Sequence, residues 1–180
     1  MANTASVYGA YLKQFKGSAR RYFVVKALEL TPESSDCRVY NEDANQLIEQ
    51  IECDILYLDP PYNHRQYGAN DHVLETIARY DSPKLRGVTG LRDYPRSDYC
   101  KPKAAQAAFT RLIESARAKH ILVSYNDEGI ISFEETCDIL RRRGEPKTFQ
   151  QVYNRFKADN GRDYKRSETI EYLHYVRVIR

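Results

Sequence analysis

The sequence has no tryptophan, a single methionine and only eight glycines among its 180 residues. It also lacks any apolar run close to the roughly 20 residues that a membrane-spanning helix needs. The first residues, MANTASVYGAYLKQFK, lack the apolar core of a secretory signal. We therefore expect a protein of the cytoplasm, with no contact to membranes and with enough residues for one globular domain.

Metal-binding and disulfide patterns are absent as well. The cysteines are far apart in the sequence, and no Cys-x-x-Cys or Cys/His spacing typical of zinc occurs, so we expect reduced structural cysteines and no metal. The histidines form no triad or metal spacing, and we interpret them as surface or hydrogen-bonded residues. These residues are Cys37, Cys53, Cys100, Cys137, His64, His72, His120 and His174.

Charge is distributed unevenly along the chain, although the net charge is only +3. Residues 84–103 hold six basic and two acidic side chains, and residues 141–166 hold nine basic and three acidic ones. The chain also has 15 tyrosines. Basic segments interleaved with aromatic rings suit nucleic acid, which offers phosphates and flat bases. A solvated charged surface explains the charge pattern equally well.

Hydrophobic periodicity predicts an α/β protein. Residues 37–180 are predicted to form a single domain, and residues 1–36 a separate N-terminal segment. A strand followed by a helix recurs along the chain, and a hairpin ends it, which favours a mainly parallel sheet with a C-terminal antiparallel hairpin. The predicted strands are 21–30, 37–40, 54–58, 119–126, 148–156 and 169–179, and the predicted helices are 41–51, 70–80, 104–118 and 132–144.

Polar residues follow three of these strands. The apolar strand DILYL runs directly into Asp59, Asp43 comes soon after the strand 37–40, and Ser124–Asn126 ends the strand 119–126. Ligands of open parallel sheets bind beyond the carboxyl ends of the strands. Packing alone would not require polar residues at three strand ends, so these residues predict a ligand site.

The four residues DPPY, 59–62, resemble the catalytic motif of S-adenosylmethionine-dependent DNA adenine-N6 methyltransferases. The similarity extends to YNEDANQLIEQI, CDILYLDPPYNHRQYGAN, HVLETIARYD, GLRDY and LVSYNDEG, which resemble the FokI-like modification methylases of restriction systems. This resemblance implies a partial Rossmann-like fold, S-adenosylmethionine as cofactor and double-stranded DNA as substrate. It also implies base flipping, since the target atom lies inside the duplex.

The resemblance assigns roles to single residues. Asp59 and the Pro60 carbonyl would accept hydrogen bonds from the adenine N6 amino group, with Pro61 fixing the backbone and Tyr62 stacking on the flipped base. The cofactor-binding candidates are Asp43, Ala44 and Asp59. The further substrate-binding candidates are Asn63, Ser124, Tyr125, Asn126, Arg92 and Arg96. The basic loop 84–103, which holds both arginines, and the tip of the C-terminal hairpin, residues 157–166, are expected to contact DNA phosphates. Two simpler interpretations stay open: Asp43 as a helix N-cap, and Ser124–Asn126 as a strand-ending turn.

One element of the family pattern is missing. No Phe-x-Gly-x-Gly turn follows a strand, and the closest pair, Gly87 and Gly90, lies in a basic loop. We therefore expect the C-terminal part of a methyltransferase, inactive alone, that needs a complementing N-terminal half or forms a homodimer. The alternatives are a nucleic-acid-binding module without catalysis and, less favoured because Asp59 stands where Asn is usual, a methyltransferase acting on RNA or protein amides.

Overall fold

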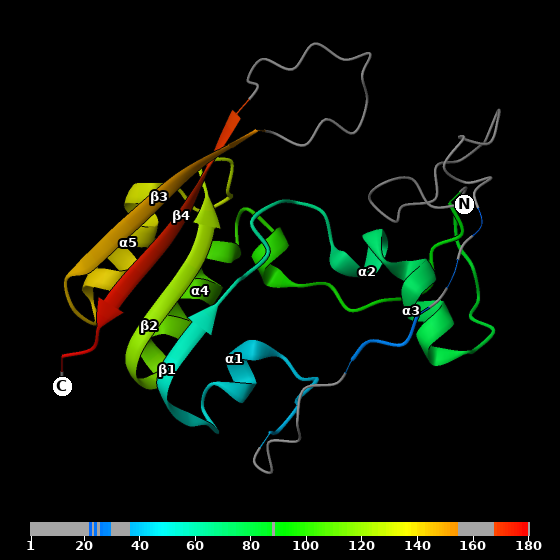
Figure 1. The fold of residues 1–180 in the computed structure, drawn as a ribbon, viewed down its shortest axis with the longest axis horizontal. Coiled ribbons are helices and arrows are strands. Elements are labelled where there is room, and N and C mark those ends of the chain that lie inside the picture. The colour runs from blue at the N-terminus through cyan, green and yellow to red at the C-terminus, as the bar shows by residue number, and fades with distance from the viewer. Residues whose placement is uncertain are drawn as a thin grey trace.

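The computed structural model describes residues 22, 24, 26–29, 37–87, 89–154 and 168–179. In this part of the chain, a four-stranded sheet packs one face against helices (Figure 1). In chain order the elements are α1 (Ala44–Leu47), β1 (Glu52–Leu58), α2 (Tyr67–Asn70), α3 (His72–Arg79), the 3-10 helix η2 (Asp98–Cys100), α4 (Ala105–Ser115), β2 (Arg117–Asn126), α5 (Phe133–Arg141), β3 (Pro146–Asn154) and β4 (Glu168–Arg177).

The sheet is mixed, with strand order β1-β2-β4-β3. β1 and β2 are parallel, whereas β4 is antiparallel to both β2 and β3. The α/β class and the C-terminal hairpin are thus confirmed, but the prediction of a mainly parallel sheet is wrong for the described residues. The reason is that β4 inserts between β2 and β3, so the hairpin supplies half of the sheet.

The predicted strand at residues 37–40 does not join the sheet. Its four residues are all exposed, and the Val39 side chain is 95% accessible. A short extended segment is stable only where a neighbouring edge satisfies its backbone. The described part of the predicted strand 21–30 has no regular structure, and its other residues lie outside the described set. Neither segment therefore pairs with the outer edge of β1 among the described residues.

The helices lie close to their predicted positions, and local chemistry explains their ends. The predicted capping box of α5 is confirmed: the Ser132 hydroxyl accepts from the Glu135 N–H at 3.2 Å, and the Glu135 carboxylate accepts from the Ser132 N–H at 2.8 Å. α4 ends three residues earlier than predicted because Arg117 already pairs with β1. Gly144 follows α5 where an added Cβ would lie 2.3 Å from the Arg177 carbonyl oxygen.

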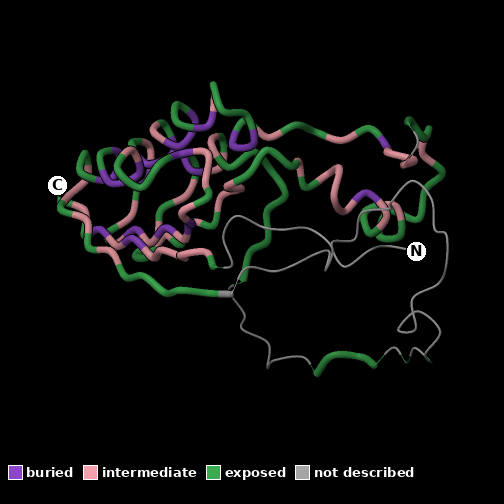
Figure 2. Tube along the Cα trace, turned by 90° about the horizontal axis from the view of Figure 1, so that it is seen from above, coloured by how far each residue is buried: buried purple, intermediate pink, exposed green. Residues whose placement is uncertain are grey.

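The core lies between α4, α5 and the inner face of the sheet, as the buried residues in Figure 2 show. Leu56 and Leu58 of β1 pack against this core. The end of β1 is therefore held in place, and so is the turn that follows it. The fully buried side chains at the centre include Phe109, Ile113, Ile121, Val123, Leu140 and Val176. None of the helices in the described part combines the length and apolar character needed to cross a membrane.

Candidate active site

The DPPY turn extends from the carboxyl end of β1. Asp59 is exposed, whereas Pro60, Pro61 and Tyr62 are partly buried. The Tyr62 carbonyl oxygen accepts a hydrogen bond of 2.9 Å from the Ile130 N–H. This bond joins the turn after β1 to the turn after β2, so the two parallel strands bring their carboxyl ends together as the sequence predicts.

Two tyrosines support each other at this junction. The Tyr62 and Tyr125 rings meet edge to face, with centroids 6.2 Å apart and an interplanar angle of 84°. Tyr125 is buried, and its hydroxyl oxygen accepts from the Ile131 N–H at 3.2 Å. Burial raises the pKa of both phenols, and Glu171 and Asp59 add to the effect on the pKa of Tyr62. Both side chains therefore stay uncharged at neutral pH.

Gly129 leaves the space that the Tyr125 ring occupies. A Cβ at this position would lie 2.1 Å from the Tyr125 Cε1 atom and 2.8 Å from two further ring atoms. The stretch LVSYNDEG thus requires its final glycine for close packing, not for an unusual backbone angle. The sequence alone gave this glycine no role.

The contacts of Ser124–Asn126 match the simpler interpretation, a turn that ends a strand. The Asn126 side chain is buried, and its Oδ1 accepts from the Glu128 N–H at 3.1 Å. Tyr125 points into the core, and Ser124 lies on the opposite face of the sheet because side chains alternate along a strand. Tyr125 contacts the DPPY turn through the ring of Tyr62.

Asp43 caps α1. Its Oδ1 accepts from the Asn45 N–H at 2.9 Å, so the N-cap interpretation is confirmed. Asn45 also donates to the Ala108 carbonyl and accepts from the Tyr99 hydroxyl, both at 2.8 Å. These bonds attach α1 to α4 and η2. Asp43 and Ala44 remain exposed on this fixed helix, so the cap does not conceal the carboxylate.

Residues 63–97, called the arm below, separate the DPPY turn from η2 and carry α2 and α3, which lie away from the sheet in Figure 1. Gln66 joins the beginning of the arm to its end: the side-chain amide donates to the Ser97 carbonyl at 3.1 Å and accepts from the Ser97 N–H at 2.8 Å. His72 is buried in the arm, with its ring nitrogens 2.9 Å from the Ala69 carbonyl and 3.2 Å from the Thr89 carbonyl.

Arg92 lies inside the arm, which corrects its assignment to DNA phosphates. Its side chain is 7% exposed, and its two terminal nitrogens donate to the Asp81 carboxylate at 2.9 and 2.7 Å. It also donates to the Thr76 hydroxyl at 3.1 Å. The pair holds the pKa of the Asp81 carboxyl below its usual range. A bidentate pair of this kind fixes the loop against α3. Arg96, by contrast, is exposed.

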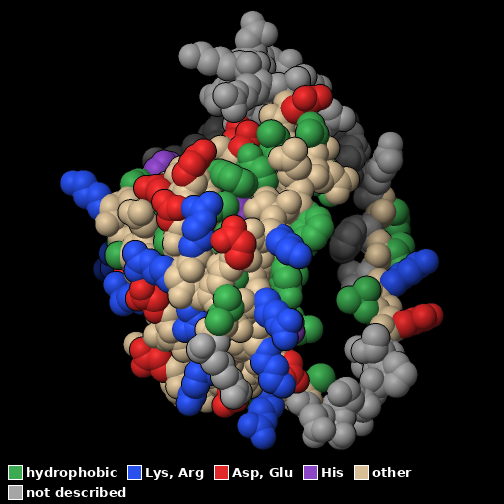
Figure 3. Space-filling model, turned by 90° about the vertical axis from the view of Figure 1, so that its left-hand side faces the viewer, with side chains coloured by type: hydrophobic (Ala, Val, Ile, Leu, Met, Phe, Trp, Pro, Cys, Tyr) green, Lys and Arg blue, Asp and Glu red, His purple; other side chains and the backbone are tan. Residues whose placement is uncertain are grey.

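The basic run at residues 141–143 is largely paired within the molecule. Arg141 bonds to Asp138, Arg142 bonds to Glu114, and Arg143 donates to the carbonyls of Glu114 and Ala116. Figure 3 shows Lys and Arg mixed with Asp and Glu on the side of the molecule that carries α5 and β3. A solvated charged surface thus describes this run better than a nucleic-acid site does. The predicted DNA-contacting hairpin tip, residues 157–166, lies outside the described residues.

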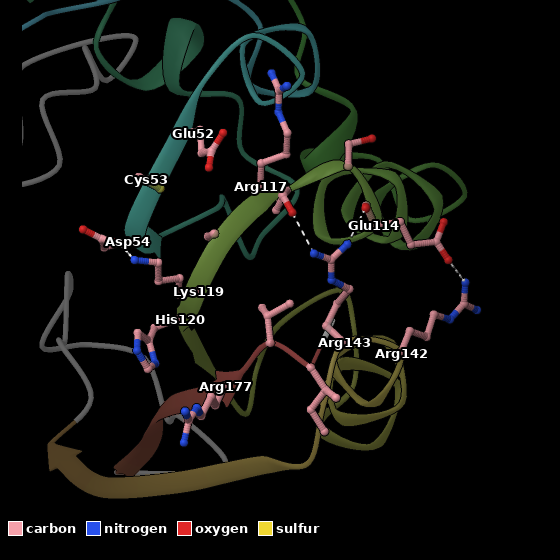
Figure 4. Close-up of a pocket in the computed structure, with 15 residues that line it drawn as sticks. Glu52, Cys53, Asp54, Glu114, Arg117, Lys119, His120, Arg142, Arg143 and Arg177 are labelled. Atoms are coloured by element: carbon pink, nitrogen blue, oxygen red, sulfur yellow. Dashed lines mark hydrogen bonds and ion pairs between the residues drawn. The ribbon is translucent and has the colours of Figure 1, made fainter.

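An open depression of about 1000 Å³ lies at the amino ends of β1 and β2, opposite to the DPPY turn (Figure 4). Its charged side chains largely bond to one another or to the backbone. Lys119 pairs with Asp54 at 2.6 Å, and the Arg143 guanidinium spans the carbonyls at the end of α4. This depression is therefore a junction between elements, and the candidate site stays at the carboxyl end of β1.

Comparison with known proteins identifies the family. The model of the D12 class N6 adenine-specific DNA methyltransferases matches residues 1–139. The chain belongs to this family. It is 49% identical to the type II methyltransferase M.NlaIII of Neisseria lactamica, over 97% of the chain and 53% of that relative. It is 43% identical to the type II methyltransferase M.FokI of Planomicrobium okeanokoites, over 98% of the chain and 28% of that relative. No solved structure matches.

The chain thus spans about half, or less, of the length of these two relatives. The resemblance to FokI-like modification methylases, expected from the sequence motifs, is confirmed. Sequence reasoning gave no role to Gln66, Asn45 or Tyr99, although the first two lie within the quoted motifs. Gln66 lies close to Tyr62 in the sequence, and Asn45 lies close to Asp43, which was the available signal. The hydrogen-bond partners of these residues lie 31 to 63 residues away.

Proposed function

We propose that this chain carries the catalytic part of an S-adenosylmethionine-dependent DNA adenine-N6 methyltransferase from a restriction-modification system. Family membership and the type II methyltransferases among its relatives support this proposal. The observation that carries it is the DPPY turn at the carboxyl end of β1, tied to the turn after β2 through Tyr62 and Ile130. We further propose that residues 37–180 form the catalytic subdomain of a larger Rossmann-like domain in the cytoplasm.

The DPPY turn suits methyl transfer to an amino group. The lone pair of the adenine N6 atom is delocalised into the ring, which makes this nitrogen a weak nucleophile. Two acceptors on its N–H bonds, the Asp59 carboxylate and the Pro60 carbonyl, favour a pyramidal nitrogen and stabilise its developing positive charge. Asp59 is exposed and can reach a substrate, and the two prolines fix the carbonyl before the base arrives.

Tyr62 is the proposed stacking platform for the flipped base. Its ring is partly buried, and Tyr125 contacts it edge to face, so the ring is oriented before the substrate binds. A base that leaves the duplex loses its stacking on both sides, and an aromatic ring restores part of it. Asn63 follows at once and is exposed, and its side-chain oxygen accepts from the Arg65 N–H at 2.9 Å.

We propose that one part of the described chain contributes to cofactor binding. S-adenosylmethionine supplies, when bound, a methyl group activated by a sulfonium. The exposed Asp43 carboxylate and Ala44, fixed on α1, would hold its adenine end, and Asp59 would line the site near the transferred group. Three described glycines have positive φ, and none of them follows a strand: Gly87 and Gly90 belong to the arm, and Gly144 follows α5. We therefore propose that the remaining cofactor contacts come from the part of the methyltransferase beyond this match.

Double-stranded DNA is the proposed substrate, and the arm is the proposed DNA-contacting element. Arg96 and Lys84 are exposed on it, whereas Arg92 acts by holding the arm in shape. The arm starts directly after Tyr62, so phosphate contacts there would lie close to the flipped base. The hairpin tip at residues 157–166 remains a second proposed phosphate contact.

Methyl transfer is tested with the chain mixed with the part of M.NlaIII that it does not match. Duplex DNA and S-adenosylmethionine carrying a labelled methyl group are added, and the DNA is digested to nucleosides. We expect label in N6-methyladenine from the mixture and none from the chain alone. Label in a cytosine product would contradict the adenine assignment. DNA binding without label, together with S-adenosylmethionine binding to neither sample, would favour a nucleic-acid-binding module.

A further inference from the structure

The beginning and the end of the arm are paired next to the DPPY turn. The Gln66 side chain bonds to both backbone groups of Ser97, donating to its carbonyl oxygen at 3.1 Å and accepting from its N–H at 2.8 Å. This pairing needs a side chain that carries a donor and an acceptor together, as a carboxamide does. Gln66 follows Tyr62 closely in the sequence, so the pairing forms where the chain leaves the candidate active site.

A second contact crosses the arm beside this pairing. Gly68 of α2 packs so closely against Tyr94 that an added Cβ would lie 2.6 Å from the Tyr94 Cβ and 2.7 Å from two further atoms of that side chain. Gly68 is not among the described glycines with positive φ, so its role is to leave space. The segment 94–97 is therefore held at both of its ends.

The partner of Gln66 is itself fixed to the body of the protein. Ser97 is the N-cap of η2, and its hydroxyl oxygen accepts from the Tyr99 N–H at 3.2 Å. Tyr99 belongs to the buried core, and the buried Cys100 donates through its Sγ to the Arg65 carbonyl at 3.3 Å. Gln66 therefore joins the beginning of the arm to a rigid element and not to another loose loop.

Two exposed side chains stand directly beside the paired residues: Tyr67 follows Gln66, and Arg96 precedes Ser97. Burial raises the pKa of the Tyr67 phenol, and the Asp59 carboxylate adds to this effect, so the paired segment lies near the DPPY turn. None of the ion pairs between described residues involves Arg96. Its guanidinium is thus available to a phosphate.

A fixed backbone makes such a phosphate contact stronger. A cation on a loose loop loses conformational freedom of the loop and of its own side chain when it binds. At position 96 the backbone is already held by the contacts of Gln66 and Gly68, so only the side chain of Arg96 remains to be ordered. The pairing therefore prepares Arg96 for binding before DNA arrives.

We propose that Gln66 is a positioning residue for methyl transfer: its pairing with Ser97 holds Arg96 where it contacts a phosphate next to the flipped adenine. The proposal rests on the proposed function, which supplies the DNA substrate. Gln66 acts through Arg96 and does not touch the reacting atoms. Its loss should therefore weaken DNA binding and leave the two acceptors of the N6 amino group, Asp59 and the Pro60 carbonyl, in place.

The test measures binding of duplex DNA by fluorescence anisotropy at several salt concentrations. The protein is the chain mixed with the part of M.NlaIII that it does not match. Gln66→Leu removes both bonds to Ser97 at similar side-chain size. We expect Gln66→Leu and Arg96→Ala each to lower the affinity at least about fivefold, and each to reduce the slope of log K against log salt concentration by about one.

A double-mutant cycle separates positioning from general damage. If Gln66 acts through Arg96, adding Gln66→Leu to Arg96→Ala should change the affinity less than about twofold. Gln106→Leu makes the same change at an exposed position of α4, and we expect an effect of less than about twofold. In the methyl-transfer assay, Gln66→Leu should raise the KM for DNA at least about fivefold and change kcat less than about threefold.

Three results would overturn the positioning role: an unchanged salt slope for Gln66→Leu, an equal loss of affinity with and without Arg96, or a lower kcat at unchanged KM. Circular dichroism checks that each variant is folded, and Gly68→Ala, which displaces Tyr94 from across the arm, replaces Gln66→Leu if that variant is not. The full pattern of DNA binding without any methyl transfer would contradict the proposed function and leave the role of Gln66 in place. Absence of DNA binding by the unmodified mixture would contradict both.

Discussion

Gly129→Ala should destabilise the protein and loosen the candidate active site. The added methyl group would lie 2.1 Å from Tyr125 Cε1, so the ring or the turn must move. Overpacking of a filled core costs about 1–3 kcal/mol, and loss of the bond between the Tyr125 hydroxyl and the Ile131 N–H adds about 1 kcal/mol. A loss of about 2–4 kcal/mol lowers the Tm of a domain of this size by roughly 5–15 °C.

Thermal unfolding followed by circular dichroism measures this loss, and Glu145→Ala, at an exposed position, serves as a control with an expected change of less than about 2 °C. The clash also predicts strong coupling. In a Tyr125→Ala background the ring is gone, so Gly129→Ala should add little further destabilisation. The packing argument is refuted if Gly129→Ala leaves the Tm unchanged, or if its effect is as large without the Tyr125 ring as with it.

The other predictions concern the base, the pH response and the arm. Tyr62→Ala should raise the KM for DNA of the reconstituted enzyme by an amount equivalent to roughly 1–3 kcal/mol of lost base binding, because stacking uses the ring. Tyr62→Phe keeps the ring and should raise the KM much less, so an equal rise in both variants would rule out stacking. Burial lowers the pKa of His174 to about 4, below its usual value, so the unfolded chain takes up the proton first as the pH falls. Stability should therefore be complete above about pH 6.5 and decrease towards pH 4. In urea titrations His174→Gln should flatten this dependence, and an unchanged slope would assign it to other groups. Arg96→Ala should reduce the slope of log K for DNA binding against log salt concentration by about one, whereas Arg92→Met should leave this slope unchanged and increase proteolysis of the arm. A reduced slope for Arg92→Met and none for Arg96→Ala would indicate that Arg92, and not Arg96, contacts DNA phosphates.

The sequence predicted most of the elements that hold the site, because their signals are local. The capping box of α5 and the apolar strand before Asp59 each occupy a few consecutive residues. The place of β4 between β2 and β3 was not predicted, since strand order depends on pairing between distant segments. Residues 37–40 show the same limit: their composition predicts a strand, but among the described residues no edge of the sheet pairs with them.

The role of Arg92 shows the same limit for a single side chain. A basic residue in a basic loop favours a phosphate contact on charge alone, and the aspartate that binds it lies eleven residues earlier. The DPPY site was predictable because its function needs a fixed order of residues at a strand end. Its supports, Tyr125, Ile130 and Gln66, make contacts that only the folded chain reveals.

Methyl transfer by the Asp59→Ala variant tests the central claim most directly. The chain and its variant are each combined with the part of M.NlaIII beyond the match, and N6-methyladenine is measured in duplex DNA by mass spectrometry. Removing one preorganised acceptor should lower the rate roughly a hundredfold or more, with the same melting temperature and the same association, because Asp59 is exposed beyond the end of β1. A variant that methylates adenine at nearly the normal rate would contradict the assignment of the DPPY turn as the catalytic site.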